Sequence, residues 1–171
     1  GAKLKVENGE IVMENVCFKY KKNGKKNVID NINLHIKAGE TIGVIGGTGS
    51  GKTTLINLIP RLYDVVQGQV LIDGTDVREY DFVSLRQRIG IVPQKSVMFK
   101  GTIRKNLLWG NENATDEQLW AALEVAQARE VVKSREEELN AQVEQGGTNF
   151  SGGQRQRLAI ARALVRKPAI L

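Results

Sequence analysis

Apolar and polar residues alternate in two stretches near the start of the chain. Residues 10–20, EIVMENVCFKY, and residues 32–37, INLHIK, follow a period of two, which is typical of strands with one buried and one solvated face. The polar segment KKNGKKN between them contains a glycine and predicts a hairpin connection. The pattern therefore predicts an antiparallel β part within residues 1–38.

A short apolar run then leads through a glycine-rich loop into a helix. Residues 41–45, TIGVI, predict a short buried strand. Pro60 should bend or loosen the later part of the helix, because proline cannot donate a backbone hydrogen bond. The apolar side chains that form one face of this predicted helix are Leu55, Ile56, Leu58, Ile59 and Leu62.

The middle of the chain continues with turns, a strand and helices. GQVLIDGTDVRE predicts a strand, an Asp-Gly turn and a second turn near Thr75 and Asp76. RIGIVPQ predicts another short apolar strand, ended by Pro93. Residues 96–135 follow a helical pattern, in which Thr115 or Asp116 is a candidate cap.

The end of the chain predicts a second loop-to-helix unit. The glycine-rich stretch QGGTNFSGGQ leads into QRQRLAIARALVRK, an amphipathic helix that Pro168 ends. Residues 169–171 are apolar and resemble the first half of a buried strand. Strands and helices in this order predict an α/β fold.

Composition and charge narrow the function classes. No apolar stretch approaches the roughly 18 residues of a membrane-spanning helix. The net charge of +6 is concentrated in residues 1–26 and 151–171, without RNA-binding or zinc-finger motifs and with only 5% aromatic residues, so no nucleic-acid partner is expected. Cys17 is the only cysteine, which excludes an internal disulfide, and we expect it to pack within a strand. His35 should face solvent from a strand.

The strongest chemical signal is the loop GGTGSGKT, which begins at Gly46 and fits G-x-x-x-x-G-K-[ST] between a predicted strand and a helix. Its glycines let backbone N–H groups point into one concavity at the positive end of a helix. Lys52 would bridge the β- and γ-phosphates, and the Thr53 hydroxyl would bind Mg²⁺. A dinucleotide fingerprint fails because Thr54 replaces its third glycine. The pattern indicates a nucleoside triphosphate site rather than a tight glycine turn.

A second glycine motif, Ser151-Gly152-Gly153-Gln154, opens the last helix and could be an ordinary helix cap or a second anion site. Together with the phosphate loop it makes the chain, from about Ile11 onward, resemble the ATP-binding domain of ABC transporters. FSGGQRQRLAIARAL is similar to the signature motif of that family, with Phe150 where leucine is usual. The resemblance implies a P-loop NTPase core with an N-terminal antiparallel β part and a helical insert.

The resemblance also assigns roles to residues and implies ATP and Mg²⁺ as cofactors. Tyr20 matches the aromatic residue that stacks on adenine, and Gln94 matches the glutamine that approaches Mg²⁺ and the attacking water. The signature residues Ser151, Gly152, Gly153 and Gln154 would contact the γ-phosphate held by a second ATP-binding domain, in a head-to-tail dimer. Arg155 and Arg157 would reinforce the positive field there, or else be solvated. The residues that match the phosphate loop are Gly46, Gly47, Thr48, Gly49, Ser50, Gly51, Lys52, Thr53 and Thr54.

Several stretches resemble the exporter branch of the family, notably VMFKGTIRKNLLWG and LINLIPRLYDVVQGQVLIDGTDV. The expected partner is a transmembrane domain of the same or an associated polypeptide, and the expected location is the cytoplasmic face of the membrane. Gln145 stands where exporters commonly carry glutamate, a variant similar to subunits of two-gene exporters with one degenerate site. Two alternatives stay open: a catalytically degenerate nucleotide-binding subunit, and a soluble, non-transport ABC ATPase.

The resemblance further implies that the chain is one incomplete domain. Its expected segments are residues 1–38 (β part), 39–94 (P-loop core), 95–150 (helical part) and 151–171 (signature helix and the start of the Walker B strand). In the family that strand ends in carboxylates for Mg²⁺ and water. We therefore expect a soluble fragment of a longer protein that hydrolyses ATP negligibly and self-associates through an open sheet edge.

Overall fold

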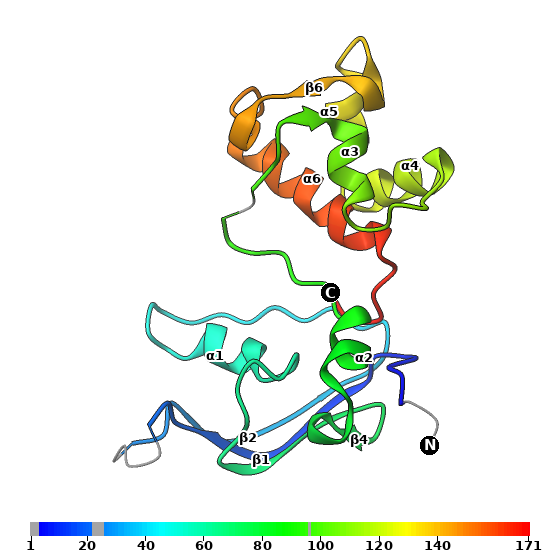
Figure 1. The fold of residues 1–171 in the computed structure, drawn as a ribbon. Coiled ribbons are helices and arrows are strands. Elements are labelled where there is room, and N and C mark those ends of the chain that lie inside the picture. The colour runs from blue at the N-terminus through cyan, green and yellow to red at the C-terminus, as the bar shows by residue number, and fades with distance from the viewer. Residues whose placement is uncertain (1–3, 22–25, 96) are drawn as a thin grey trace. The chain divides into compact units, whose positions relative to one another are not determined.

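The computed structural model describes residues 4–21, 26–95 and 97–171 (Figure 1). The chain divides into two compact units, one of Gly1–Ile89 with Ile170 and the other of Gly90–Ala169 with Leu171. In the described part of the chain, no helix has the length and apolar character needed to cross a bilayer. The finer division into four segments stays a prediction.

The first unit contains a four-stranded antiparallel sheet in the order β2-β1-β3-β4. Its strands are β1 (Ile11–Phe18), β2 (Ile29–Ile36), β3 (Gln67–Ile72) and β4 (Thr75–Asp76). Both predicted N-terminal strands are confirmed, although residues 22–25 of the predicted connection lie outside the described residues. The Asp73-Gly74 turn joins β3 to β4. The second turn, predicted at Thr75 and Asp76, lies later, in the 3-10 helix η1 (Val77–Glu79).

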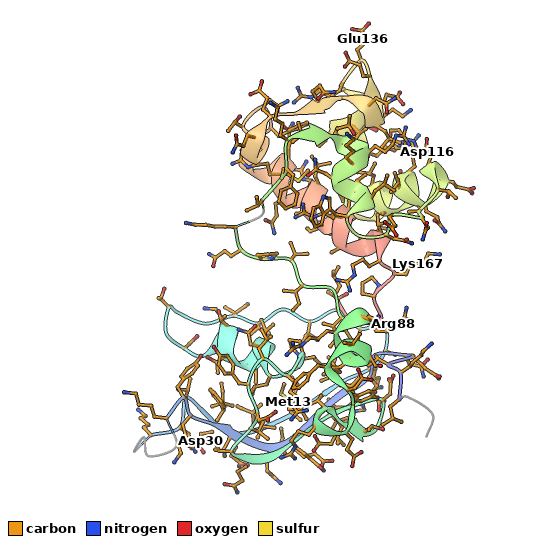
Figure 2. All side chains as sticks on the ribbon, viewed as in Figure 1. Met13, Asp30, Arg88, Asp116, Glu136 and Lys167 are labelled. Atoms are coloured by element: carbon orange, nitrogen blue, oxygen red, sulfur yellow. The ribbon has the colours of Figure 1, made fainter. Side chains whose placement is uncertain are left out.

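Strand β1 is an inner strand of this sheet, because it pairs with β2 along one edge and with β3 along the other. Met13, labelled in Figure 2, is 1% exposed, and Val16 is fully buried. Cys17 is buried in the same strand, as predicted. His35 is exposed on β2 and lies 3.3 Å from the Glu10 carboxylate, which confirms its solvent-facing position.

Two helices, α1 (Lys52–Asn57) and α2 (Phe82–Gln87), lie over the same side of the sheet in Figure 1. Helix α1 ends at Asn57, and irregular turns follow around the buried Pro60, so the predicted loosening is confirmed. The apolar face of α1 is consequently shorter than the face predicted from the sequence. Leu58 is 1% exposed, whereas Leu62 is 48% exposed.

Two predicted strands do not form. Residues 41–45 run as an open stretch before α1, and Ile45 is 99% exposed (Figure 1). In RIGIVPQ only Ile89 pairs, through an isolated parallel bridge to Ile170. A strand requires a neighbour that satisfies its backbone N–H and C=O groups, and none of the described strands pairs with residues 41–45. The strand predictions for these two segments were therefore wrong, apart from the bridge at Ile89.

The second unit is mostly helical, and α6 (Gly152–Val165) packs against α3 (Ile103–Leu108) and α4 (Asp116–Val125). Its other elements are α5 (Arg129–Lys133), η2 (Glu138–Asn140), η3 (Gln145–Gly147) and the two-stranded sheet of β5 (Gly101–Thr102) and β6 (Gln142–Val143). The fully buried side chains that hold the three helices together include Leu107, Leu119, Leu123 and Leu158. Thr115 caps α4 through a capping box, as predicted.

The Asp73 carboxylate fixes the N-terminal segment to the β3–β4 turn. Its two oxygens accept four backbone hydrogen bonds, from the N–H groups of residues 7, 8, 9 and 10, at 2.8 to 3.0 Å. Burial of Asp73 opposes ionisation, but the four donors outweigh burial and lower the pKa of the carboxyl below its ordinary value. Charged Asp73 is therefore part of what stabilises the first unit.

We predict that Asp73→Asn lowers the free energy of unfolding by about 1–3 kcal/mol at neutral pH, because an amide cannot accept four N–H bonds. A lowered folded pKa contributes stability that is present above the unfolded value of 3.8 and is lost as pH falls through the folded value. The difference in unfolding free energy between wild type and Asp73→Asn should therefore become smaller below that pH. Urea denaturation followed by circular dichroism measures it. Glu40→Gln changes an exposed carboxylate and is the control. A difference in unfolding free energy between wild type and Asp73→Asn that does not change with pH would contradict this account.

Close packing between α6 and the turn that follows α3 yields a second prediction. A Cβ atom on Gly110 would collide with the carbonyl oxygen of Arg162 and lie 3.2 Å from the Cβ atom of Val165. Gly110→Ala should therefore destabilise the second unit by about 1–3 kcal/mol, followed by tryptophan fluorescence in urea. At Gly152 a Cβ would meet only Arg155, at 3.8 Å, so Gly152→Ala should stay within about 0.5 kcal/mol of wild type. If Gly110→Ala and Gly152→Ala lost the same unfolding free energy, the packing argument would be refuted.

Candidate functional site

The glycine loop lies immediately before α1 in the first unit and ends in a left-handed residue. Gly51 has φ 92°, a conformation that glycine adopts without strain, and it is the N-cap of α1. A Cβ atom on Gly51 would lie 3.1 Å from Cδ1 of Ile29 and 3.3 Å from the carbonyl oxygen of Val28. The loop is therefore seated against the start of β2.

Lys52 turns back over this loop. Its ammonium group donates hydrogen bonds to the carbonyl oxygens of Gly46 and Gly47, the second at 3.1 Å. The loop also closes on itself, because the N–H of Ser50 donates to the Gly47 carbonyl at 3.1 Å. The positive charge and the glycine backbone thus occupy one small region of the molecule.

Tyr20 lies beside the start of α1, although 34 positions separate it from Thr54. The Tyr20 hydroxyl is hydrogen-bonded to the hydroxyl of Thr54. Thr54 as a residue is only 5% exposed. The Tyr20 side chain remains 56% exposed, so part of its ring is open to solvent. Thr53, the residue before Thr54 in α1, is exposed. The structure therefore brings Tyr20 and the phosphate-loop residues together in one unit.

The signature residues form the start of α6 in the second unit. Ser151 is the N-cap, and its hydroxyl accepts the Gln154 N–H at 3.2 Å while the Gln154 side chain accepts the Ser151 N–H at 3.0 Å. This capping box leaves the N–H groups of Gly152 and Gly153, at the first two helical positions, without partners inside the helix. Gly152 and Gly153 are both exposed.

The loop before Ser151 is held by two arginines. Arg155 donates to the carbonyl oxygens of Gly147, at 3.3 Å, and Phe150, at 2.7 Å. Arg135 donates to Asn149 at 2.8 Å and lies 4.3 Å from the centre of the buried Phe150 ring. Arg155 is half-buried and fixes the loop, so it is not simply solvated, and its contribution to the positive field at the signature end stays a prediction.

The remaining candidates also lie in the second unit, Gln94 and Gln145 outside its α-helices and strands and Arg157 on α6. Gln94 is exposed, in a bend after Pro93. Gln145 is exposed in η3, and Arg157 is exposed on α6. Within the first unit the structure brings together Tyr20 and the phosphate loop, and within the second unit it brings together the four signature residues.

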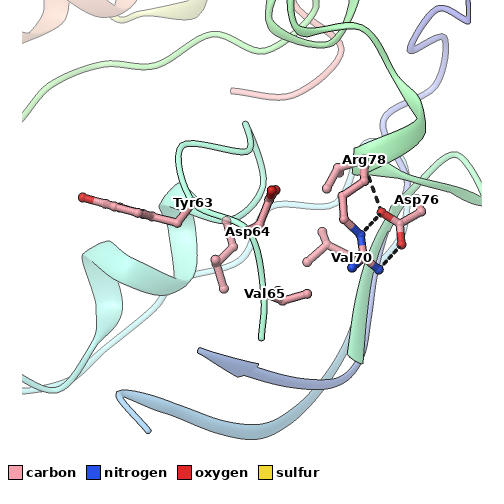
Figure 3. Close-up of a pocket in the computed structure, with 8 residues that line it drawn as sticks. Tyr63, Asp64, Val65, Val70, Asp76 and Arg78 are labelled. Carbon is pink, nitrogen blue, oxygen red and sulfur yellow. Dashed lines mark hydrogen bonds and ion pairs between the residues drawn. The ribbon is translucent and has the colours of Figure 1, made fainter. Parts of the chain in front are cut away.

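Pattern reasoning missed Tyr63, which follows α1. Tyr63 lines a pocket of the first unit and points away from its Arg78–Asp76 ion pair (Figure 3). The hydrogen bonds and charge of Arg78 lower the pKa of the Asp76 carboxyl, although burial opposes this. The residues that line the pocket are Leu58, Tyr63, Asp64, Val65, Val70, Asp76, Val77 and Arg78. In the sequence, Tyr63 is marked only as an aromatic residue that comes directly after the predicted apolar helix face.

A comparison with protein families supplies the identity. The family described as ABC transporter matches residues 29–171, which is most of the chain. The chain belongs to the ABC transporter family. Its α/β fold, with an N-terminal antiparallel β part and a helical insert around a P-loop NTPase core, is confirmed by this match and by the structural comparison below.

Known ABC proteins include close relatives of this chain. An uncharacterized ABC transporter ATP-binding protein of Mycobacterium tuberculosis is 51% identical over 84% of this chain and 25% of its own length. A Bacillus subtilis protein, provisionally named multidrug export ATP-binding/permease protein, is 42% identical over 95% of this chain and 28% of its own length. The chain therefore spans about a quarter of these relatives.

A solved structure of a bacterial Atm1-family ABC exporter with ATP bound is also similar. It has a TM-score of 0.83 and 34% sequence identity, over 97% of this chain and 29% of that chain. The resemblance to the exporter branch of the ABC family, inferred from the motifs, agrees with this result.

The contribution of the Ser151 cap can be tested by measuring the stability of the second unit of this ABC protein. We predict that Ser151→Ala lowers the unfolding free energy of the second unit by about 1 kcal/mol, because the Gln154 N–H loses its acceptor. Ser151→Thr retains a hydroxyl and should cost only a few tenths of a kcal/mol. Tryptophan fluorescence in urea provides the comparison, and an alanine variant as stable as the threonine variant would show that the cap is not needed.

Proposed function

We propose that this chain is the ATP-binding, energy-coupling domain of an ABC-type exporter. The observation that carries the proposal is the glycine loop with Lys52 folded over it, next to the exposed ring of Tyr20. A loop that offers backbone N–H groups and one ammonium group suits a polyphosphate, and a partly exposed aromatic ring suits a nucleobase.

The nucleotide would lie across the first unit. Residues 46–54 would bind the phosphates, and Tyr20 would stack on the adenine. Lys52 would exchange its two carbonyl acceptors for β- and γ-phosphate oxygens, because an ammonium group has three donors and gains from charged acceptors. During in-line attack of water on the γ-phosphate, Lys52 would stabilise the charge that develops there.

Magnesium would accompany the phosphates. Among the described residues no group of three or more His, Cys, Asp or Glu side chains could hold a metal ion. That fits Mg²⁺ at a nucleotide site, which uses few protein ligands together with phosphate oxygens and water. The exposed Thr53 hydroxyl, at the start of α1, fits as one oxygen ligand. Mg²⁺ would supply charge neutralisation between the phosphates.

The signature end of α6 would contact the nucleotide of a second ATP-binding domain. Ser151, Gly152 and Gly153 present a hydroxyl and two helix N–H groups at the positive end of a fourteen-residue helix. In a head-to-tail pair each ATP would lie between one phosphate loop and one signature end. The membrane-spanning partner would belong to the same polypeptide or to an associated one, at the cytoplasmic face.

Calorimetric titration with a non-hydrolysable ATP analogue and Mg²⁺ tests the proposed site. Lys52→Ala should weaken binding roughly tenfold to a hundredfold, because charge-assisted hydrogen bonds to the phosphates are lost. Lys37→Ala removes an exposed lysine of the same unit and is the matched control, with binding unchanged. The proposal is wrong if the wild-type chain binds no analogue, or if the two lysine variants bind equally.

A further inference from the structure

Tyr20 belongs to a cluster of three aromatic rings in the first unit. Its ring centroid lies 5.0 Å from that of Phe18 and 5.3 Å from that of Tyr63, at interplanar angles of 85° and 89°. Phe18 and Tyr63 also touch, with centroids 5.4 Å apart. Edge-to-face pairs at these distances are favourable beyond the area that they bury. Tyr20 is thus packed against two rings while more than half of its side chain stays exposed.

The two neighbours of Tyr20 differ in origin. Phe18 is a buried residue of β1, the strand that leads to Tyr20 itself. Tyr63 comes from the turn after α1, so its contact joins two segments that are far apart along the chain. Together with the Tyr20–Thr54 hydrogen bond, the Tyr63 contact ties the ring to the helix that begins at the phosphate loop.

The turn that carries Tyr63 is itself braced. Arg61 donates to both carboxylate oxygens of Asp64, at 2.7 and 3.2 Å, so an ion pair spans Tyr63. Arg86 donates to the carbonyl oxygens of Pro60, at 3.1 Å, and Arg61, at 3.0 Å. The hydrogen bond between Arg61 and Asp64 lowers the pKa of the Asp64 carboxyl and raises that of Arg61. A ring on such a turn provides a fixed surface rather than a mobile one.

We propose that Tyr63 is a positioning residue, which holds the ring of Tyr20 in place for stacking against the nucleobase. The inference rests on the proposed ATP site and adds to it a residue that does not itself touch the nucleotide. Without Tyr63, the Tyr20 side chain would regain rotamer freedom, and ordering it again would weaken binding. The effect should be confined to ligands that carry a base.

Titrations on the intact chain test this role. Tyr63→Leu should weaken binding of the ATP analogue roughly threefold to tenfold, the range expected for an aromatic pair. Binding of inorganic tripolyphosphate, which has no base, should be unchanged. Tyr63→Phe retains the ring and should restore the wild-type affinity for the analogue. In a Tyr20→Leu background, Tyr63→Leu should have no additional effect, because no ring remains to be positioned.

Equal losses of analogue and tripolyphosphate affinity in Tyr63→Leu would instead indicate damage to the phosphate loop and would overturn the proposal. The proposal would also be overturned if Tyr63→Leu lowered the affinity for the analogue as much in the Tyr20→Leu background as it does in the wild-type chain.

A measurement without ligand separates this proposal from that of ATP binding. In NMR spectra of the tyrosine rings, Tyr63→Leu should shift the Tyr20 ring protons toward free-tyrosine values, and Tyr63→Phe should not. Unshifted Tyr20 signals would refute the role of Tyr63, whether or not ATP binds.

Discussion

The bonds between the Lys52 ammonium and the carbonyl oxygens of Gly46 and Gly47 are the interaction on which the proposed site depends. They keep the only lysine of the loop against the glycine backbone, although the preceding residues 41–45 are exposed and unpaired. Gly51 anchors the other end of the loop against Val28 and Ile29. The shape of the loop thus comes from contacts among its own residues and from contacts with the start of β2. For this reason the short motif was enough to predict the loop from the sequence.

Features that depend on local chemistry could be predicted from the sequence. The alternation in residues 10–20 and 32–37 gave the antiparallel strands, because side chains of a strand alternate between two faces. The cap of α6 followed from a serine three positions before a glutamine, and Thr115 caps α4 in the same way. The end of α1 before Pro60 followed from the missing donor of proline.

Features that depend on distant partners could not be predicted. Residues 41–45 have the composition of a buried strand, but no described strand lies alongside to pair with them. Asp73 looked like an ordinary turn residue, yet it binds four N–H groups more than sixty positions away. In both cases the outcome depended on whether a distant segment supplied a hydrogen-bonding partner.

Hydrogen exchange of individual backbone amides, with and without ATP and Mg²⁺, tests the central claim most directly. If the loop around Lys52 binds the phosphates, the amides of residues 46–54 should exchange more slowly when nucleotide is present, because their N–H groups would gain phosphate acceptors. Exchange within the paired core of β1 and β3 should change little. Unaltered exchange across residues 46–54 under saturating nucleotide, or protection confined to another part of the chain, would contradict the account.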